Sequence, residues 1–442
     1  MHGRTMRRTR IAAAGAVIVA LALTGCAPES SPAYTPAPQV EGALPEDLQT
    51  QLHDAVAHAM AASGSTGAVV GVWAPWSGSW VTGIGTAGPG DETPASTDMA
   101  FRIGDVTRLM TCDVLYALAD RGTVALEDSV TTWVAGVPDL ADVTLLDLCN
   151  GTSGLGLSSS IAESNWLSNP TRMWNPKELA SYGMEQQRTA PGGGFRDSDA
   201  AYLLLGQALE RASGQSAASL IRTYVTGPLG LNSTSLPSAR PAAPSDGPVL
   251  AGTYAPRTPE GGYDCAAPVD VTVSSASIGF TDSGVVSTIE DLGRYAQAEA
   301  KQALRTKDEP ARFGAPLPAY DGAPSWFQAT GGGYLVGTMV GQQGWAPGYL
   351  TAAYSDPASG FTVAVVLNGS SGGGALISAL AFELAAIGSK APAAKGAAAP
   401  EFGLPFTAEQ YHEVIGSQAI CPVDQPAAEE PAGEDEGEGD DD

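Results

Sequence analysis

The stretch of residues 101–122, FRIGDVTRLMTCDVLYALADRG, constrains the fold of this chain more than any other. Its apolar residues recur at helical spacing around most of the helix surface: Val106, Leu109, Met110, Val114, Leu115 and Leu118. This pattern predicts a helix that is buried in the interior of a domain and whose first turn forms the floor of a pocket. Asp105 stands at the predicted start, where its carboxylate can cap free backbone N–H groups.

The stretch also resembles the FRIGSxTK segment of serine β-lactamases and DD-peptidases, especially the class C and esterase-like branch. In that family the Ser is the acylated nucleophile, and the Lys one turn later is a proton acceptor or electrostatic helper. The same frame here reads FRIGDVTR, so Asp105 takes the nucleophile position and Arg108 the lysine position. A carboxylate lacks the required hydroxyl, and a guanidinium cannot accept a proton at neutral pH.

The resemblance continues in order along residues 143–155 (VTLLDLCNGTSGL), 191–214 (PGGGFRDSDAAYLLLGQALERASG) and 284–292 (GVVSTIEDL), and covers roughly residues 45–388. Strand-like runs lie at both ends of this region, at residues 66–73, 79–84, 334–339, 349–354 and 361–367. The resemblance implies an α/β fold of the serine β-lactamase and penicillin-binding-protein type. In that fold an antiparallel sheet built from both ends of the chain is flanked by helices, and a helical subdomain is inserted.

Two further family motifs are also altered. The Tyr-x-Asn motif falls on Asp197 and Asp199, and the Lys-Thr-Gly or His-x-Gly motif falls on Gln342 and Gly344. The resemblance therefore implies that the tyrosine, the asparagine and the strand cation of the family's site are all missing. The alternative is that these positions are solvated loop residues with no site to serve.

We expect Arg108 to bind Asp105 or Asp199, so that ion pairs replace the hydrogen bonds among the family's Ser, Lys and Tyr. With Asp197, three acids would face one cation, and the surplus negative charge would repel the carboxylates of β-lactams and peptides. Three acids could also hold a divalent cation through oxygen ligands, but a guanidinium in the same cluster disfavours this. We therefore predict no metal and no cofactor.

Lysine and histidine offer no replacement. None of the five lysines follows a serine by three positions, because those positions hold Trp174, Ala298, Leu304, Ile387 and Pro392. The four histidines are His2, His53, His58 and His412. His2 lies in the signal sequence, and we interpret the other three as isolated surface residues rather than catalytic bases.

An active serine hydrolase, such as an esterase, amidase or peptidase, would need an unrecognised nucleophile such as Ser198, Thr107 or Ser371. Ser371 lies in residues 369–373, GSSGG, which match GxSxG between a predicted strand and a predicted helix. Only His412 follows it as a possible base. In the family that the chain resembles, this segment is a loop, so we interpret the match as fortuitous.

Four cysteines follow Cys26, which allows three pairings. The resemblance favours Cys112 with Cys149, since the family packs these helical segments together around the pocket. Cys265 would then pair with Cys421 and pin the C-terminal segment to the domain. Buried free thiols are the alternative.

The N-terminus predicts export. Basic residues precede an apolar run, and the run ends in LTGC, which resembles a bacterial lipobox with Cys26 as the lipidated residue. The predicted organisation is a lipoprotein signal peptide (1–25), a Pro/Ser-rich tether (26–44), the β-lactamase-like domain (45–388), a spacer and C-terminal segment (389–421) and an acidic disordered tail (422–442). The formal charge of −26 disfavours nucleic acid and direct binding to anionic lipid, so the lipid on Cys26 is the predicted membrane attachment.

These observations predict an extracytoplasmic lipoprotein of the cell envelope that is related to DD-peptidases and class C β-lactamases but is non-catalytic. A binding or scaffolding role follows, with a cell-wall peptide or a protein as partner. The rival prediction is an active serine hydrolase that uses a non-standard nucleophile.

Overall fold

The computed structural model describes residues 1, 3, 34–36, 38–401 and 403–422. The predicted signal peptide and Cys26, and the acidic tail beyond residue 422, lie outside the described residues. The helices and strands all belong to the unit that begins at Ala33. Within the described part of the chain, no helix combines the length and the apolar character needed to cross a bilayer.

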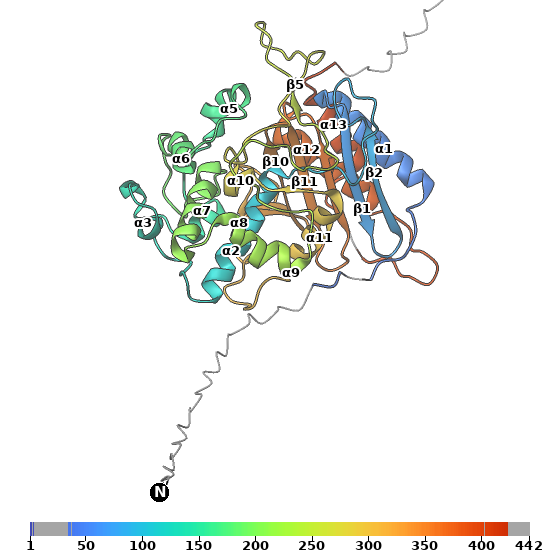
Figure 1. Ribbon diagram of the computed structural model, residues 1–442. Coiled ribbons are helices and arrows are strands. Elements are labelled where there is room, and N and C mark those ends of the chain that lie inside the picture. Colours follow the sequence, from blue (N-terminus) through green and yellow to red (C-terminus); the bar gives the residue numbers. More distant parts are fainter. Residues whose placement is uncertain (2, 4–33, 37, 402, 423–442) are drawn as a thin grey trace, which may run out of the picture. The chain divides into compact units, whose positions relative to one another are not determined.

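An eight-stranded antiparallel sheet occupies the centre of this unit, in the order β2-β1-β12-β11-β10-β9-β8-β7 (Figure 1). Its strands are β1 (Gly67–Ala74), β2 (Gly78–Gly85), β7 (Leu317–Pro318), β8 (Phe327–Thr330), β9 (Gly333–Val336), β10 (Met339–Ala346), β11 (Tyr349–Ser355) and β12 (Thr362–Leu367). β1 pairs with β12, with Val70 opposite Val365, so the two ends of the chain meet in one sheet. The predicted fold class is confirmed.

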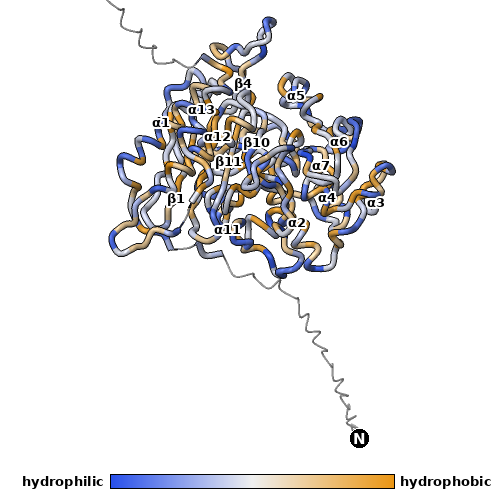
Figure 2. Tube along the Cα trace, turned by 180° about the vertical axis from the view of Figure 1, so that it is seen from behind, coloured by the Kyte–Doolittle hydropathy of each residue, from blue (hydrophilic) through white to orange (hydrophobic). Residues whose placement is uncertain are grey.

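Both faces of the sheet are buried, because successive side chains of β1 enter different cores. Val70 packs in the core formed with α1 (Glu46–Ser63), α12 (Gly373–Gly388) and α13 (Ala408–Ser417). Val69 belongs to the second core, which α11 (Ile289–Ala300) and the helical region complete. In Figure 2 the hydrophilic residues, drawn in blue, lie mainly on the outer helices and loops.

The helical region lies between β2 and β7 in the sequence. Its helices are α2 (Thr107–Asp120), α3 (Val130–Trp133), α4 (Leu145–Asn150), α5 (Ser159–Ser168), α6 (Pro176–Met184), α7 (Asp199–Ser213), α8 (Ala217–Ile221), α9 (Gly227–Leu229) and α10 (Phe280–Ser283). Two short ladders also form here, β3 (Phe101–Arg102) with β6 (Val286–Ser287) and β4 (Thr253–Tyr254) with β5 (Val269–Asp270).

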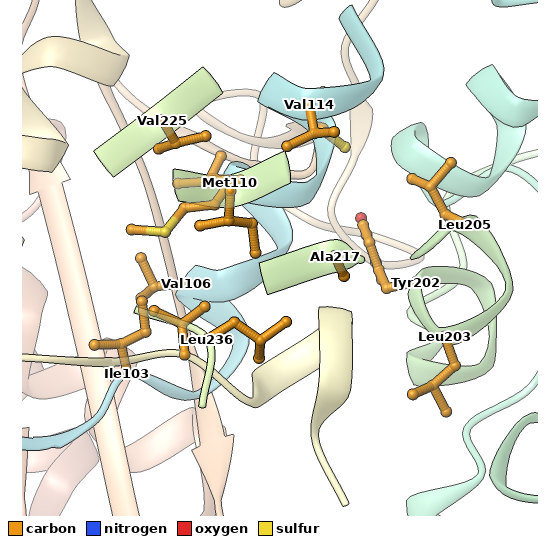
Figure 3. Packing of buried hydrophobic residues seen from close by; sticks show 14 of the residues in the cluster. Ile103, Val106, Met110, Val114, Tyr202, Leu203, Leu205, Ala217, Val225 and Leu236 are labelled. Atoms are coloured by element: carbon orange, nitrogen blue, oxygen red, sulfur yellow. The ribbon is translucent and has the colours of Figure 1, made fainter. Parts of the chain in front are cut away.

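α2 is the predicted interior helix. Met110 is fully buried and Val114 nearly so, and they pack against the fully buried Val225 of the helical region (Figure 3). The prediction that Asp105 caps this helix is wrong. A 3-10 turn, η1 (Gly104–Val106), precedes α2, and neither element has a side-chain cap hydrogen bond. The carboxylate of Asp105 therefore does not bind the backbone N–H groups at the start of α2 and can interact with another side chain.

The predicted strand at residues 334–339 is also corrected. A turn divides it into the end of β9 and the start of β10, and Gly337 in that turn has a positive φ of 62°. A side chain at a left-handed position is strained, so glycine suits the turn. The apolar run is continuous in sequence although the chain reverses direction.

Both predicted disulfides are present, Cys112–Cys149 and Cys265–Cys421. The first links α2 to α4, and the second joins the end of the described chain to a loop 156 residues earlier. Residues 38–44 run beside the β1–β2 turn, where the Val40 N–H donates to the Pro75 carbonyl at 2.9 Å. Whether the residues before them act as a tether stays a prediction.

Candidate functional site

The site begins where the turn before α2 meets the sheet. Asp105 lies in η1 and faces Gly344 on β10. A Cβ atom added to Gly344 would lie 2.0 Å from Oδ2 of Asp105, so only glycine admits this approach. The fold therefore brings together two of the family's motif positions, as the resemblance implies.

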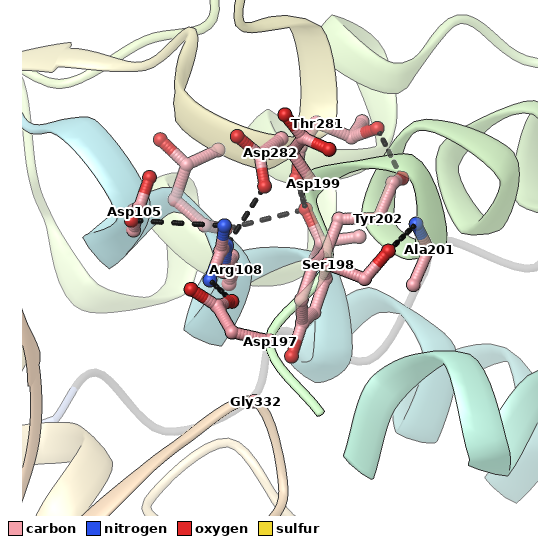
Figure 4. A network of polar contacts seen from close by, with 12 residues as sticks. Asp105, Arg108, Asp197, Ser198, Asp199, Ala201, Tyr202, Thr281, Asp282 and Gly332 are labelled. Atoms are coloured by element: carbon pink, nitrogen blue, oxygen red, sulfur yellow. Dashed lines mark hydrogen bonds and ion pairs between the residues drawn. The ribbon is translucent and has the colours of Figure 1, made fainter. Parts of the chain in front are cut away.

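Arg108 is the centre of the cluster (Figure 4). Its Nε donates to Oδ1 of Asp282 at 2.7 Å, and its Nη1 donates to Oδ1 of Asp197 at 2.6 Å. Its Nη2 lies 3.6 Å from Oδ2 of Asp105, and the guanidinium carbon stands 4.9 Å from the ring centre of Tyr202. The side chain is only 5% exposed, so one buried cation holds three acids and an aromatic face.

Asp199 was predicted as an alternative partner of Arg108, and the structure gives its carboxylate different partners. Its carboxylate accepts hydrogen bonds from the N–H groups of Ser158 at 2.6 Å and Ser159 at 2.8 Å, and contacts to Arg108 are absent from its described hydrogen bonds. Asp199 therefore caps the first turn of α5 and joins it to α7. Its place in the cluster is taken by Asp282.

Asp282 was not predicted from the sequence. It lies in the short helix α10, two residues before the 284–292 segment that carries the family resemblance. The only local feature that could have drawn attention to Asp282 is that it is a single acid among small and apolar residues. Nothing in its spacing links it to Arg108, which is 174 positions away.

Gln342 is buried and hydrogen-bonded to backbone. Its Nε2 donates to the Gly332 carbonyl at 2.9 Å, and its Oε1 accepts from the Gln343 N–H at 2.8 Å. Both ends of the amide are occupied. The position that carries the family's cation thus has a neutral side chain that ties β10 to the turn before β9.

Burial controls the charge of the cluster. Burial raises the pKa of Asp105 well above its usual range, and Arg108 only partly offsets this because Asp282 and Asp197 raise it further. Burial likewise raises the pKa of Asp282 to about 6 against the lowering effect of Arg108. Burial acts to lower the pKa of Arg108, but the three acids outweigh it and leave that pKa raised. Burial therefore favours the neutral form of Asp105, while Arg108 keeps its positive charge.

The cluster opens to solvent at one carboxylate. The side chain of Asp197 is 40% exposed, whereas those of Asp105 and Asp282 are 16% and 8% exposed. Beside it, the rings of Phe195 and Tyr334 form an edge-to-face pair with centres 5.8 Å apart.

A separate cavity of about 420 Å³ lies between the N-terminal segment, the β1–β2 turn and residues 397–400, and contains no motif residue.

The alternative nucleophiles are engaged with backbone. Ser198 Oγ donates to the Gly156 carbonyl at 2.8 Å and caps α7. Thr107 Oγ1 accepts from the Val285 N–H at 3.2 Å, and Ser371 Oγ lies 2.9 Å from the Ala255 N–H. Ser198 and Thr107 are also buried, at 1% and 0% exposed. In the described contacts, none of these hydroxyls has a basic side chain as its hydrogen-bond partner.

A family model described as Beta-lactamase matches residues 52–386. The chain belongs to the beta-lactamase family. Among similar relatives of this beta-lactamase-family protein are the D-alanyl-D-alanine-carboxypeptidase/endopeptidase AmpH of Escherichia coli K12 (32% identical), penicillin-binding protein 4* of Bacillus subtilis (29%) and esterase EstB of Burkholderia gladioli (32%). These matches cover about a third of this chain (34%, 33% and 34%) and 40%, 32% and 41% of the relatives.

Solved structures resemble this beta-lactamase-family protein over a longer region. A D-stereospecific amidohydrolase from Streptomyces aligns with 76% of this chain and 96% of its own, at a TM-score of 0.62 and 21% identity. A penicillin-binding protein homologue from Pyrococcus abyssi aligns with 76% of each chain, at a TM-score of 0.61 and 21% identity. At this identity the likeness shows the fold.

Proposed function

We propose that this beta-lactamase-family protein is a lipid-anchored, non-catalytic member that acts as a binding or scaffolding protein at the cell envelope. One observation carries the proposal. The position of the family's nucleophile is occupied by Asp105, which lies 3.6 Å from the buried guanidinium of Arg108 at the lysine position.

The chemistry of the two side chains supports the loss of acyl transfer. The family's reaction requires a hydroxyl that attacks a carbonyl carbon and a neighbouring group that takes its proton. Attack by the Asp105 carboxylate would give an anhydride in place of a stable ester. Arg108 cannot take the proton, because its pKa is raised further by the acids around it.

The charge of the cluster also opposes anionic ligands. One guanidinium faces three carboxylates, and the carboxylate that reaches solvent is Asp197. A carboxylate-bearing β-lactam or peptide would be repelled by about 1 kcal/mol for each nearby uncompensated charge at intermediate dielectric. A neutral or cationic portion of a cell-wall peptide, or a protein segment with such groups, is the ligand class that suits this surface.

Labelling of the purified protein tests the loss of catalysis. We expect neither fluorescent penicillin nor a fluorophosphonate probe to attach covalently, while penicillin-binding protein 4* of Bacillus subtilis serves as the positive control for penicillin. Labelling that is lost in Ser198→Ala, Thr107→Ala or Ser371→Ala would establish an active hydrolase instead. Ser378→Ala is the matched control, because Ser378 is a half-buried serine of α12 that lies outside the family's motif positions.

The lipid anchor is proposed from the sequence around Cys26. Metabolic labelling with a fatty-acid probe should mark the wild-type protein and place it in the membrane fraction. Cys26→Ser should abolish both. A wild-type protein that carries no lipid would contradict the anchor without affecting the argument about Asp105 and Arg108.

A further inference from the structure

A second polar cluster lies away from the site, in the layer of helices α1, α12 and α13. His58 on α1 and His412 on α13 stack with ring centres 3.9 Å apart. Glu383 on α12 completes the group, with its Oε1 2.9 Å from Nδ1 of His412. His412 is exposed, as the sequence-based interpretation of a surface residue expects, but His58 and His412 are not isolated from each other.

The cluster contains buried polar atoms without partners. Within the described chain, Nδ1 of His58 and Oε2 of Glu383 are both buried and have no hydrogen-bond partner. The Glu383 side chain is 5% exposed. A buried polar atom that lacks a partner costs about 1–3 kcal/mol, so two of them on adjacent side chains require a physical explanation.

We infer that His58, Glu383 and His412 form a binding site for a divalent transition-metal ion, with Zn²⁺ as the best match. Each residue offers one ligand atom, and these atoms lie within 4.8 Å of one another. Two imidazoles and one carboxylate are a ligand set that Zn²⁺ accepts in proteins, with a fourth position left for water.

The placement of the three residues suits a metal ion. Glu383 fixes a buried carboxylate on a rigid helix, whereas the side chain of His412 is 51% exposed and can adjust toward an ion. The exposed side also gives an entry path and a place for a water ligand. The unpartnered oxygen of Glu383 and nitrogen of His58 would then have a partner.

A metal ion here would act as a structural clamp. The three ligands come from three helices, and α13 follows the spacer that begins after residue 388. The Cys265–Cys421 disulfide fixes the same segment four residues beyond the end of α13. The C-terminal segment would thus be held by a covalent bond at its end and by a metal ion along its helix.

Metal binding by the untagged full chain tests the inference. After incubation with Zn²⁺ and removal of excess ion, we expect one tightly bound zinc per chain by elemental analysis and a higher melting temperature. His58→Ala and His412→Ala should each lose this zinc and the thermal shift. Their affinity should fall by more than the ~10–100-fold that loss of an outer-shell partner costs.

His53→Ala is the matched control, because His53 also lies on α1 but faces solvent beside Asp54. This variant should bind zinc like the wild type. Since His412 is exposed, its replacement should leave the protein folded, and an unchanged melting temperature in a chelator would verify this. Failure of the wild type to bind one equivalent, or zinc retained equally in His58→Ala and His412→Ala, would overturn the site.

Discussion

Two buried arginines, Arg312 and Arg108, form ion pairs around α2, and their surroundings differ. Arg312 pairs with Asp113 of α2, whereas Arg108 lies near Asp105 of the preceding turn η1. Arg312 is 1% exposed and pairs with Asp113 of α2 and, at 2.7 Å, with Glu299 of α11. Both carboxylates are 2% exposed. Arg108 is nearly as buried, but it faces three carboxylates, one of which reaches solvent.

The remaining donors of Arg312 are also occupied. Its Nε donates to the Gly331 carbonyl at 2.9 Å and its Nη2 to the Leu109 carbonyl at 2.8 Å, while the hydroxyl of Tyr295 donates to Asp113 at 2.8 Å. Every side chain in this network is buried, so we assign it a structural role. The Arg108 network has surplus negative charge and an opening at Asp197, so the same ion-pair chemistry there leaves a surface that a ligand can reach.

Replacement of Arg312 should have the largest effect. Arg312→Met leaves Asp113 and Glu299 buried without a cation, which should lower the free energy of unfolding by about 3–5 kcal/mol. Urea unfolding of the disulfide-intact protein measures this. If the variant does not fold, Glu299→Gln offers a milder change that keeps the pairing with Asp113. A loss below about 1 kcal/mol would contradict a closed structural network.

Replacement of Arg108 should cost less. Arg108→Met should lower the free energy of unfolding by about 2–3 kcal/mol, because Asp197 can be solvated and Asp105 already favours its neutral form. The same urea titration compares the two variants directly. Equal losses for Arg108→Met and Arg312→Met would show that solvent access does not distinguish the networks.

The pH dependence of stability should sharpen the contrast. Since the pKa of Asp282 is raised to about 6, the folded protein holds a proton that the unfolded chain releases between about pH 4 and pH 6. This group therefore stabilises the fold at low pH, and its contribution is lost as the pH rises through about 6. We expect a fall on the order of 1–2 kcal/mol between pH 4 and pH 7.

Asp282→Asn should reduce that dependence, as measured by urea unfolding at pH 4, 5, 6 and 7, and the remainder should come from other buried acids such as Asp105, whose pKa is also raised. Asp98→Asn is the control, because Asp98 is exposed and accepts a hydrogen bond only from the nearby Ser96 in the described structure. An Asp282→Asn profile that keeps the wild-type slope would show that another group holds the proton.

An exposed arginine should show the smallest effect. Arg172 pairs with Glu178 at 2.6 Å, but the two side chains are 50% and 41% exposed. Arg172→Met should change the free energy of unfolding by less than about 1 kcal/mol, because water and salt screen such a pair. A loss comparable to that of Arg108→Met would mean that burial is not what sets the strength of these ion pairs.

Much of the fold was predictable from sequence. The apolar spacing of residues 101–122 identified an interior helix, and alternating runs identified individual strands. The antiparallel sheet that joins both ends of the domain followed from the family resemblance. Errors arose at the ends of elements. Asp105 was predicted to be a cap because capping residues precede helices, but it lies within the 3-10 turn η1 that precedes α2.

The site was predictable only in part. Asp105, Arg108 and Asp197 lie on motif positions that the family resemblance identifies, and they do meet. Asp199 lies two residues from Asp197, yet the start of α5 takes its carboxylate. Whether the Asp199 carboxylate binds Arg108 or the free N–H groups of α5 depends on how α5 and α7 pack. The spacing of residues in the sequence does not predict that packing.

The sequence by itself determined which chemistry is absent at the motif positions, because side-chain identity decides whether a group can attack or accept a proton wherever it lies. Only the tertiary structure decided which charges share a site. Arg108 meets Asp282 across 174 positions, and His58 meets His412 across helices from opposite ends of the domain. These contacts follow from the burial of apolar faces over the whole sheet, which brings together polar residues that carry no mutual signal in the sequence.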